Sequence, residues 1–230
     1  MTHRVAFIVG AGSGLSASLA RLLREQGLRI ALGARDVEKL EPLAHQTDAQ
    51  LVSMDAADAA SVDAAFHRVD TAVGVPDVVI YNAGRRLRGP VTDLDPTEVA
   101  EALAVGAYGG FLVAQQAARR LLPRGSGALL FTGASASVKG YAQSSPFAMS
   151  KFALRGLAQS LARELAPRGI HVAHFVIDGG IASASRPESQ DAPDSLLDPE
   201  AIARTYLHVL QQPRSAWTWE IELRPWVERF

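Results

Sequence analysis

The sequence predicts one α/β domain built on a doubly wound parallel sheet with helices on both faces. Short β-branched runs alternate with longer helical patterns, which is typical of successive βαβ units. The 230 residues, 48% hydrophobic and 20% charged, are enough for one sizeable core, and no internal repeat or long polar linker divides them. The expected strands cover residues 5–9, 29–32, 50–53, 78–81, 128–132 and 172–177.

Local sequence patterns predict the character of three individual segments. Residues 5–9 are apolar and lead into glycines, and the run is too short for a signal-peptide core or a membrane span. Residues 183–198, rich in Ser, Pro, Asp and Ala, precede a helix that begins near Pro199, and we expect a flexible loop that is either a disordered surface loop or a substrate lid. The clearest helix carries an apolar stripe at spacings of three and four: Leu154, Leu157, Ala158, Leu161 and Leu165.

Composition and charge exclude several classes of partner. The formal net charge is −1, so we expect no nucleic acid and no membrane as partner, and a small molecule fits better. The absence of cysteine excludes disulfides and thiolate chemistry. His171 and His174 lie three apart, on or beside an expected strand, and face opposite sides, so no metal site is predicted. We expect a cytoplasmic protein.

A glycine-rich segment carries the first chemical signal. Gly10, Gly12, Ser13 and Gly14 follow the first strand and open the helix that begins near Leu15. Glycines permit a tight turn and close approach of a ligand, while the N–H groups and positive dipole end of the helix favour a pyrophosphate. In this strand–turn–helix context the segment predicts the dinucleotide site of a Rossmann fold, against the alternative of a plain glycine turn.

The end of the second strand indicates which dinucleotide is bound. Arg35 follows Ala34 at the place where an acidic residue would accept hydrogen bonds from ribose hydroxyls, and Asp36 comes only after it. A guanidinium fits a 2′-phosphate instead. We therefore expect NADP(H) to be preferred over NAD(H); the alternative is that Arg35 is merely solvated.

In this order, the motifs make the chain resemble the short-chain dehydrogenase/reductase family over nearly its whole length. Gly10 and Gly14 match that family's glycine-rich loop, although its leading threonine is Val9 here and its last glycine is Ser16. The resemblance implies further cofactor-binding residues: Asp55 and Ala56 at the adenine, Asn82, Ala83 and Gly84 after the fourth strand, Lys151 at the ribose, and Gly179, Ile181 and Ser183 at the nicotinamide turn.

The same resemblance implies a catalytic centre that this chain retains only in part. In the family, a tyrosine four residues before a lysine donates a proton, and that spacing places both on one helix face. Lys151 is present, but Phe147 stands where the tyrosine is expected. The family's polarising serine aligns with Ala134, leaving Ser135 one position away, and its helix asparagine aligns with Gly106.

Several groups are candidates to replace the missing proton donor. Tyr141 is the first choice, and the others are Tyr108, Asp178 and Ser144 or Ser145. Each also has a structural interpretation: the tyrosines pack, a serine caps the helix, and Asp178 bonds to backbone N–H groups of its own turn. The candidate catalytic set is Lys151, Ser135, Tyr141 and Phe147.

Three functions remain open. The first is an NADP(H)-dependent oxidoreductase that acts on a small, largely apolar carbonyl or unsaturated compound with an altered proton-donor site. The second is a non-catalytic NADP(H)-binding sensor or silent subunit. The third is a non-redox lyase or isomerase, against which the retained glycines argue.

The end of the chain indicates self-association. Residues 217–223 resemble the last strand that packs subunits together in the family, and residues 217–230 are expected to form an interface strand and tail. Three tryptophans and one phenylalanine lie in these residues, and this aromatic content is unusual for an exposed tail on a monomer. We expect a homodimer or homotetramer. The aromatic residues are Trp217, Trp219, Trp226 and Phe230.

Overall fold

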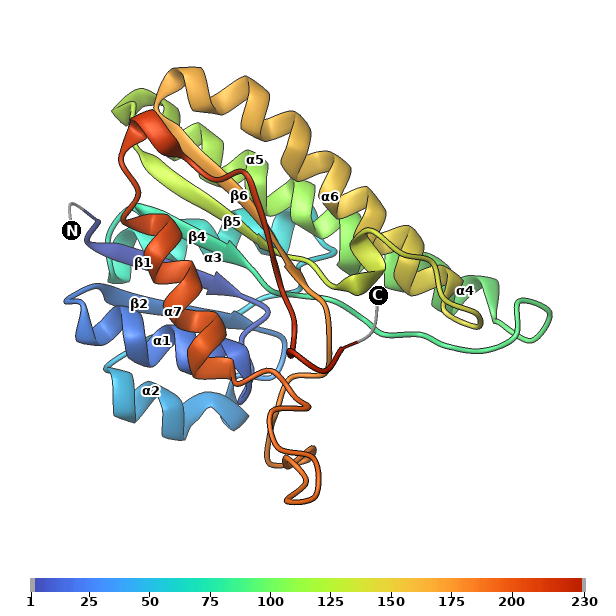
Figure 1. Cartoon of the computed structure of the whole chain (residues 1–230). Coiled ribbons are helices and arrows are strands. Elements are labelled where there is room, and N and C mark those ends of the chain that lie inside the picture. Colours follow the sequence, from blue (N-terminus) through green and yellow to red (C-terminus); the bar gives the residue numbers. More distant parts are fainter. Residues whose placement is uncertain (1–2, 229–230) are drawn as a thin grey trace.

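A single seven-stranded sheet forms the centre of the chain. The computed structural model describes residues 3–228, so Phe230 and the end of the predicted interface tail lie outside the described residues. Within that range all strand pairs are parallel, in the order β3-β2-β1-β4-β5-β6-β7 (Figure 1). The strands are β1 (Val5–Val9), β2 (Arg29–Ala34), β3 (Gln50–Ser53), β4 (Val78–Tyr81), β5 (Gly127–Thr132), β6 (Ile170–Ile177) and β7 (Glu220–Leu223).

Helices cover both faces of the sheet. One face carries α1 (Leu15–Glu25), α2 (Glu41–Thr47) and α7 (Pro199–Leu210). The other carries α3 (Ala59–Ala72), α5 (Gly109–Leu121) and α6 (Ser145–Leu165), with α4 (Pro96–Leu103) packed on α6 and joined to α5 by a π-helical turn, Ala104–Tyr108. Short 3-10 turns cover Glu38–Leu40, Leu122–Arg124, Ser135–Ser137, Ala166–Arg168 and Arg214–Ala216.

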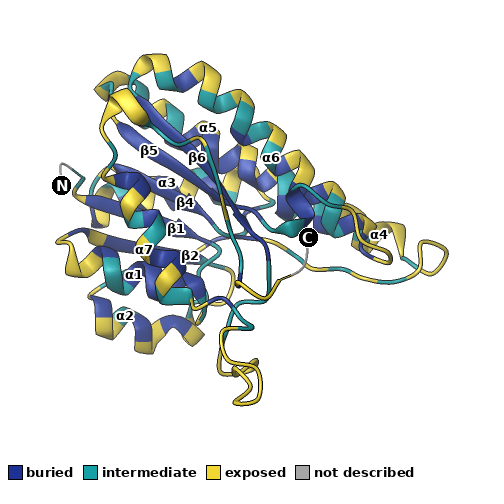
Figure 2. Ribbon diagram, in the orientation of Figure 1, coloured by how far each residue is buried: buried dark blue, intermediate teal, exposed yellow. Residues whose placement is uncertain are grey.

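The sheet separates two hydrophobic cores, and strand alternation assigns each side chain to one of them (Figure 2). In β1, Phe7 packs edge-on against Phe66 of α3 with ring centroids 5.2 Å apart, while Ile8 lies on the opposite face. Both side chains are fully buried, and burying one such side chain contributes about 1.5–3 kcal/mol. The doubly wound single domain expected from the sequence is confirmed.

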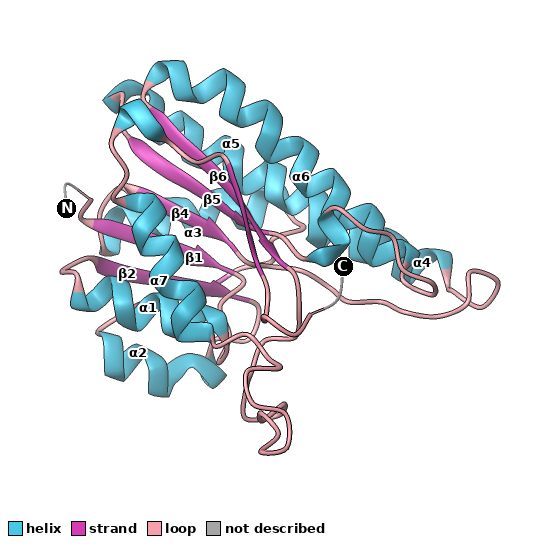
Figure 3. Ribbon diagram, in the orientation of Figure 1, coloured by secondary structure: helices cyan, strands magenta, loops and turns pink. Residues whose placement is uncertain are grey.

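Strand limits agree with the sequence pattern at three strands and differ at the other four. The bounds of β1, β3 and β4 are as predicted, whereas β2 continues through Gly33 to Ala34 and β5 begins one residue earlier, at Gly127. β6 begins two residues earlier than predicted, at Ile170, and β7 begins at Glu220 rather than at residue 217. Gly33 pairs with Val9 in the ladder, and a Cβ there would lie 2.6 Å from the sulfur of Met54, so the position requires glycine. The loops after the strands gather at one edge of the sheet (Figure 3), and residues 183–198 contain no helix or strand.

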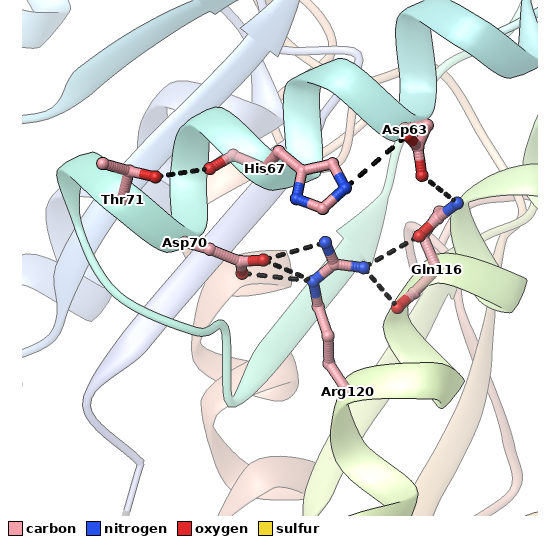
Figure 4. A network of polar contacts seen from close by, with 6 residues as sticks. All are labelled: Asp63, His67, Asp70, Thr71, Gln116 and Arg120. Carbon is pink, nitrogen blue, oxygen red and sulfur yellow. Dashed lines mark hydrogen bonds and ion pairs between the residues drawn. The ribbon is translucent and has the colours of Figure 1, made fainter.

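A polar network joins α3 to α5 beside the core (Figure 4). The guanidinium of Arg120 lies 4.9 Å from the ring centroid of Phe66 and donates to Asp70 from Nε and Nη2, each at 2.8 Å. It also donates to the side chain of Gln116, whose amide donates to Asp63 at 2.8 Å. The side chains of Arg120 and Asp70 are only 13% and 23% exposed, so solvent screens this pair less than an ordinary surface pair.

One continuous helical stretch in the described range, Pro96–Arg124, is long and apolar enough to span a membrane by length and composition alone. Its most apolar window has a mean hydropathy of 1.2 and is 39% buried inside this fold. Core helices of soluble proteins meet the same criterion. Here α5, which belongs to this stretch, packs its apolar side chains on the sheet.

Candidate functional site

Three adjoining cavities lie at the carboxyl edge of the sheet. The central cavity, about 520 Å³, is lined by the glycine loop, residues 132–135, Phe147 and the turn after β6. The β2-side cavity, about 290 Å³, is lined by the ends of β2, β3 and β4. The outer cavity, about 330 Å³, shares Phe147 and Ser135 with the central cavity and extends to Tyr141. In open parallel sheets ligands bind at this edge.

The glycine loop forms a cradle open to the central cavity. Gly10 has φ +80°, and a Cβ there would lie 2.4 Å from the backbone of Ala83, so no side chain fits. At Gly12 and Gly14 a Cβ would meet nothing within 4 Å. No side chain caps α1 at Gly14, which leaves the positive end of that helix for an anion. These residues fit a pyrophosphate.

Ser16, which stands where the family has glycine, joins the glycine loop to the sheet by hydrogen bonds. Its hydroxyl donates to the carbonyl of Gly10 at 3.2 Å and accepts from Nδ2 of Asn82 at 2.7 Å. Asn82 itself follows β4, and its backbone N–H donates to Val9 at 2.8 Å. Ser16 therefore connects the helix start to the loops after β1 and β4.

The β2-side cavity brings together the residues predicted to bind the adenosine half. Asp55, Ala56 and Arg35 line it with Asn82, Ala83 and Gly84. Arg35 is exposed and forms no ion pair with any described residue, whereas its neighbour Asp36 pairs with Lys39 at 2.6 Å. A free guanidinium at this rim suits a phosphate monoester.

The turn after β6 closes the other end of the central cavity. Gly179, Ile181 and Ser183 line it, and Gly179 has φ +155°. The carboxylate of Asp178 is buried and forms ion pairs with Lys139 at 2.8 Å and Arg224 at 3.2 Å. The interpretation of Asp178 as an acceptor for backbone N–H groups of its own turn is therefore wrong. Burial alone would raise the pKa of Asp178, but bonds from Lys139 and Ser135 lower it.

Lys151 lies where the resemblance places it, beside Phe147. Its ammonium donates to the carbonyl of Thr132 at 2.8 Å and lies 5.9 Å from the centroid of the Phe147 ring. Burial lowers the pKa of Lys151 to about 8. The guanidinium of Arg86 lies 5.7 Å from the same centroid, so two cations flank a ring that carries no hydroxyl.

The two other altered positions differ in how much room they leave. Ala134 and Ser135 both line the central cavity, so a serine hydroxyl is present one position away from the implied site. Gly106 lies in the π-helical turn, and a Cβ there would stand 2.6 Å from Cβ of Ser150. An asparagine at Gly106 would therefore require α6 to move.

The candidate replacement donors are placed unequally. Tyr141 lines the outer cavity with Ser135 and Phe147. Tyr141 and Tyr108 are 47% and 51% exposed, so each is about half packed, and the ring of Tyr108 stacks on Phe111 with centroids 6.3 Å apart. Ser144 occupies the N-cap position of α6, but its hydroxyl makes no capping bond. Its interpretation as a side-chain cap is wrong.

A buried relay supports the loop that carries Ala134. Ser137 accepts from the backbone N–H of Ala134 at 3.1 Å and contacts Nε2 of His174 at 3.3 Å. Nδ1 of His174 lies 3.0 Å from the carboxylate of Glu220 in β7. The same carboxylate accepts hydrogen bonds from Nε and Nη2 of Arg155 at 2.6 and 2.7 Å. Burial lowers the pKa of His174 to about 4, although Glu220 opposes that change.

Three arginines at the site were missed by sequence reasoning. Arg86 and Arg186 line both the central and outer cavities, and Arg88 lines the outer cavity. The run Arg85-Arg86-Leu87-Arg88 directly after Asn82-Ala83-Gly84 was the available signal. Nothing in the sequence marked Arg186, which lies in the loop after β6. Among the described residues, no group of three or more His, Cys, Asp or Glu is arranged to hold a metal ion.

A parallel sheet with a glycine cradle at the start of α1 and cavities along its carboxyl edge defines a dinucleotide-binding protein of Rossmann type. The chain belongs to the short-chain dehydrogenase family, whose model matches residues 4–193.

Relatives agree over nearly the full length. An uncharacterized oxidoreductase of Staphylococcus aureus strain USA300 is 30% identical, covering 98% of each chain. A crystal structure of a short-chain dehydrogenase from Rhodopseudomonas palustris is 33% identical, covers 97% of this chain and 99% of its own, and has a TM-score of 0.83. An alcohol dehydrogenase from Thermococcus sibiricus, complexed with 5-hydroxy-NADP, is 26% identical with 98% coverage of each chain and a TM-score of 0.88.

The buried His174 predicts acid sensitivity. Its pKa is about 4 in the folded chain against an ordinary 6.5, so between these values the unfolded chain binds more protons. The stability that neutral His174 contributes is therefore complete above pH 6.5 and is lost as pH falls towards 4. From pH 7.5 to pH 5 this amounts to about 2 kcal/mol.

In urea denaturation at these two pH values, His174→Gln should lose about 2 kcal/mol less on acidification than the wild type. His67→Gln, on the exposed surface of α3, is the control and should behave as the wild type. An unchanged pH dependence in His174→Gln would contradict the prediction.

Proposed function

We propose that the protein is an NADP(H)-dependent oxidoreductase acting on a small carbonyl or unsaturated compound, with an altered proton-donor site. The observation that carries the cofactor preference is Arg35, which is exposed and forms no ion pair with any described residue, at the rim of the cavity that Asp55 and Ala56 line. We further propose a cytoplasmic protein.

Each half of the cofactor has a set of residues suited to it. The cradle at Gly10, Gly12 and Gly14 suits the pyrophosphate, and the buried ammonium of Lys151 suits the ribose hydroxyls of the nicotinamide half. The turn at Gly179 and the nearby Ser183 and Ile181 suit the nicotinamide. When bound, NADPH supplies a hydride. The residues of this chain orient the acceptor, exclude water and handle the proton.

The site is less complete in groups that donate a proton to the substrate than in groups that bind the cofactor. A positioned general acid contributes about 10²- to 10⁴-fold, whereas correct orientation of the reacting groups is worth ~7–11 kcal/mol. A site that retains orientation without a strong acid suits an acceptor whose product takes its proton from water. Conjugated carbonyl and iminium compounds are of this kind.

A second function is supported by Gly106. A Cβ at Gly106 would meet Ser150, so the place of the family's asparagine is closed by packing as well as empty of a polar group. Phe147 and Ala134 lack a donor too. These three positions together support a non-catalytic NADP(H)-binding sensor or silent subunit.

We propose that the chain forms a homodimer or homotetramer. Large apolar side chains that are 43–51% exposed lie on α5, on α6 and on the π-helical turn that precedes α5, and the rings of Tyr108 and Phe111 stack with centroids 6.3 Å apart. On the tail, Trp226 is 80% exposed, while Trp217 stacks on His171. The exposed apolar residues of the helices are Tyr108, Phe111, Met149 and Phe152.

The cofactor preference is tested by calorimetric titration with NADPH and NADH. Arg35→Ala removes the group expected to receive the 2′-phosphate, so NADPH affinity should fall about tenfold or more while NADH affinity changes little. Arg168→Ala, an exposed arginine at the opposite edge of the sheet, is the control. Equal NADPH affinity in the wild type and Arg35→Ala would refute the role of Arg35, and no binding of either cofactor would refute the proposed function.

The proton-donor site is tested by Phe147→Tyr. The new hydroxyl would stand on a ring close to Lys151, which is mostly charged below its pKa of about 8. Turnover of simple ketones with NADPH should therefore rise at least about tenfold at pH 7. Phe152→Tyr, on the same helix but 45% exposed, should give no gain. With NADPH bound, an inactive Phe147→Tyr would favour the sensor or silent subunit.

The replacement donor is tested by Tyr141→Phe. Loss of this hydroxyl should lower any native NADPH-dependent turnover by about 10²-fold or more if Tyr141 donates the proton, with cofactor affinity unchanged. Tyr108→Phe, also half exposed, is measured beside it, and a loss confined to Tyr108→Phe would assign the donor to that other candidate. Unchanged turnover in Tyr141→Phe would exclude Tyr141 as the donor.

A further inference from the structure

Three guanidinium groups converge on the outer cavity from two separate loops. Arg86 and Arg88 come from the loop after β4, and Arg186 comes from the loop after β6. Arg186 lies against the nicotinamide turn, because a Cβ added to Gly180 would stand 3.0 Å from its Nη1. The three arginines are therefore brought together by tertiary folding, since the segments that carry them are about a hundred residues apart in the sequence.

These arginines are not neutralised by the rest of the described chain. None of the three forms an ion pair with a described carboxylate, whereas the adjacent Arg85 points elsewhere and pairs with Glu98 and Glu101. Among the described residues that line the outer cavity, the acidic side chain is Glu228, which also forms no described ion pair. The described lining residues therefore bring three positive charges and one negative charge to this cavity.

The positive charge lies next to the reacting end of the site. The outer cavity includes Ser135, Phe147 and Gly179, all of which also line the central cavity. Arg86 lies over the Phe147 ring with its guanidinium carbon 5.7 Å from the centroid. A group bound by Arg86 in the outer cavity would therefore be within a short distance of a carbonyl placed at the nicotinamide turn.

We propose that Arg86, Arg88 and Arg186 form a subsite for an anionic group of the substrate, a carboxylate or a phosphate, so that the substrate is a small carbonyl or unsaturated acid or phosphate ester. This inference rests on the proposed oxidoreductase function and changes the expected substrate from largely apolar to one with an anionic end.

The chemistry of the three side chains favours this class of ligand. A guanidinium is planar, always charged, and donates paired N–H bonds that match carboxylate and phosphate oxygens. A cavity of about 330 Å³ accommodates a small acid and lies at the lower end of the range for ligand pockets. Held by its charged end, such a substrate would be oriented without a hydroxyl at Phe147.

The test compares matched charged and neutral ligands. The protein is saturated with NADP⁺, so that the cofactor's own phosphates already occupy their sites, and is titrated calorimetrically with acetoacetate and methyl acetoacetate, then with dihydroxyacetone phosphate and dihydroxyacetone. At least one anion should bind about tenfold or more tightly than its neutral partner, and the preferred pair identifies carboxylate or phosphate.

Arg86→Ala should remove that preference, lowering anion affinity about tenfold (~1.4 kcal/mol) without weakening the neutral partner. Arg85→Ala is the control because it removes the same charge one residue away from outside the cavities, and it should retain the preference. An unchanged circular dichroism spectrum and an unchanged thermal unfolding midpoint show that each variant is folded. Equal affinity for both members of each pair, or an equal loss in Arg85→Ala, would overturn the subsite.

The binding of NADP⁺ distinguishes failure of the proposed function from failure of the anionic subsite. If NADP⁺ itself does not bind, the oxidoreductase proposal fails at that step. The same ligand pairs are then compared in the cofactor-free protein, where loss of anion preference in Arg86→Ala but not in Arg85→Ala supports the subsite and its absence overturns it.

Discussion

Every part of the candidate site depends on the close approach of the carboxyl ends of β1 and β4. Their parallel pairing places Gly10 so near Ala83 that a Cβ would lie 2.4 Å from its backbone. Backbone bonds from Gly10 to Gly33 and from Asn82 to Val9 hold this contact from both sides. The cradle for the pyrophosphate is therefore fixed by the sheet, and the neighbouring strands bring the remaining loops to the same edge.

The same dependence explains which features could be predicted from the sequence. A glycine cluster after a buried strand, or a lysine one turn from Phe147, is a local pattern, so the fold could be predicted, and a set of cofactor residues proposed, without coordinates. Asp178 could not, because its partners Lys139 and Arg224 are 39 and 46 positions away along the chain. Arg186 reaches the outer cavity only through tertiary folding. Such pairings leave no signal at the spacing of a helix or a strand.

Lys151 shows what remains when the hydroxyl beside it is absent. Its ammonium is buried against the carbonyl of Thr132, and burial lowers its pKa to about 8. Removing a charge from water is costly unless partners replace the lost hydration. One carbonyl replaces only part of that hydration, so Lys151 is held in a poorly compensated position. Hydroxyl groups of a ribose would supply further acceptors, which is consistent with the binding role proposed for the retained lysine.

The absence of a hydroxyl at Phe147 and the presence beside it of Arg86, which pairs with no carboxylate of the described residues, have related energetic consequences. A factor of 10²–10⁴ from a general acid corresponds to about 3–5 kcal/mol, which is less than the ~7–11 kcal/mol available from orientation. A substrate anchored by its charge at Arg86, next to the ring, could keep much of the larger contribution while losing the smaller one. A neutral ketone has no such anchor and depends more on a donor at its oxygen. Altered proton transfer and an anionic substrate are thus consistent with each other, since the charge that orients the substrate lies on the side of the site where the hydroxyl is missing.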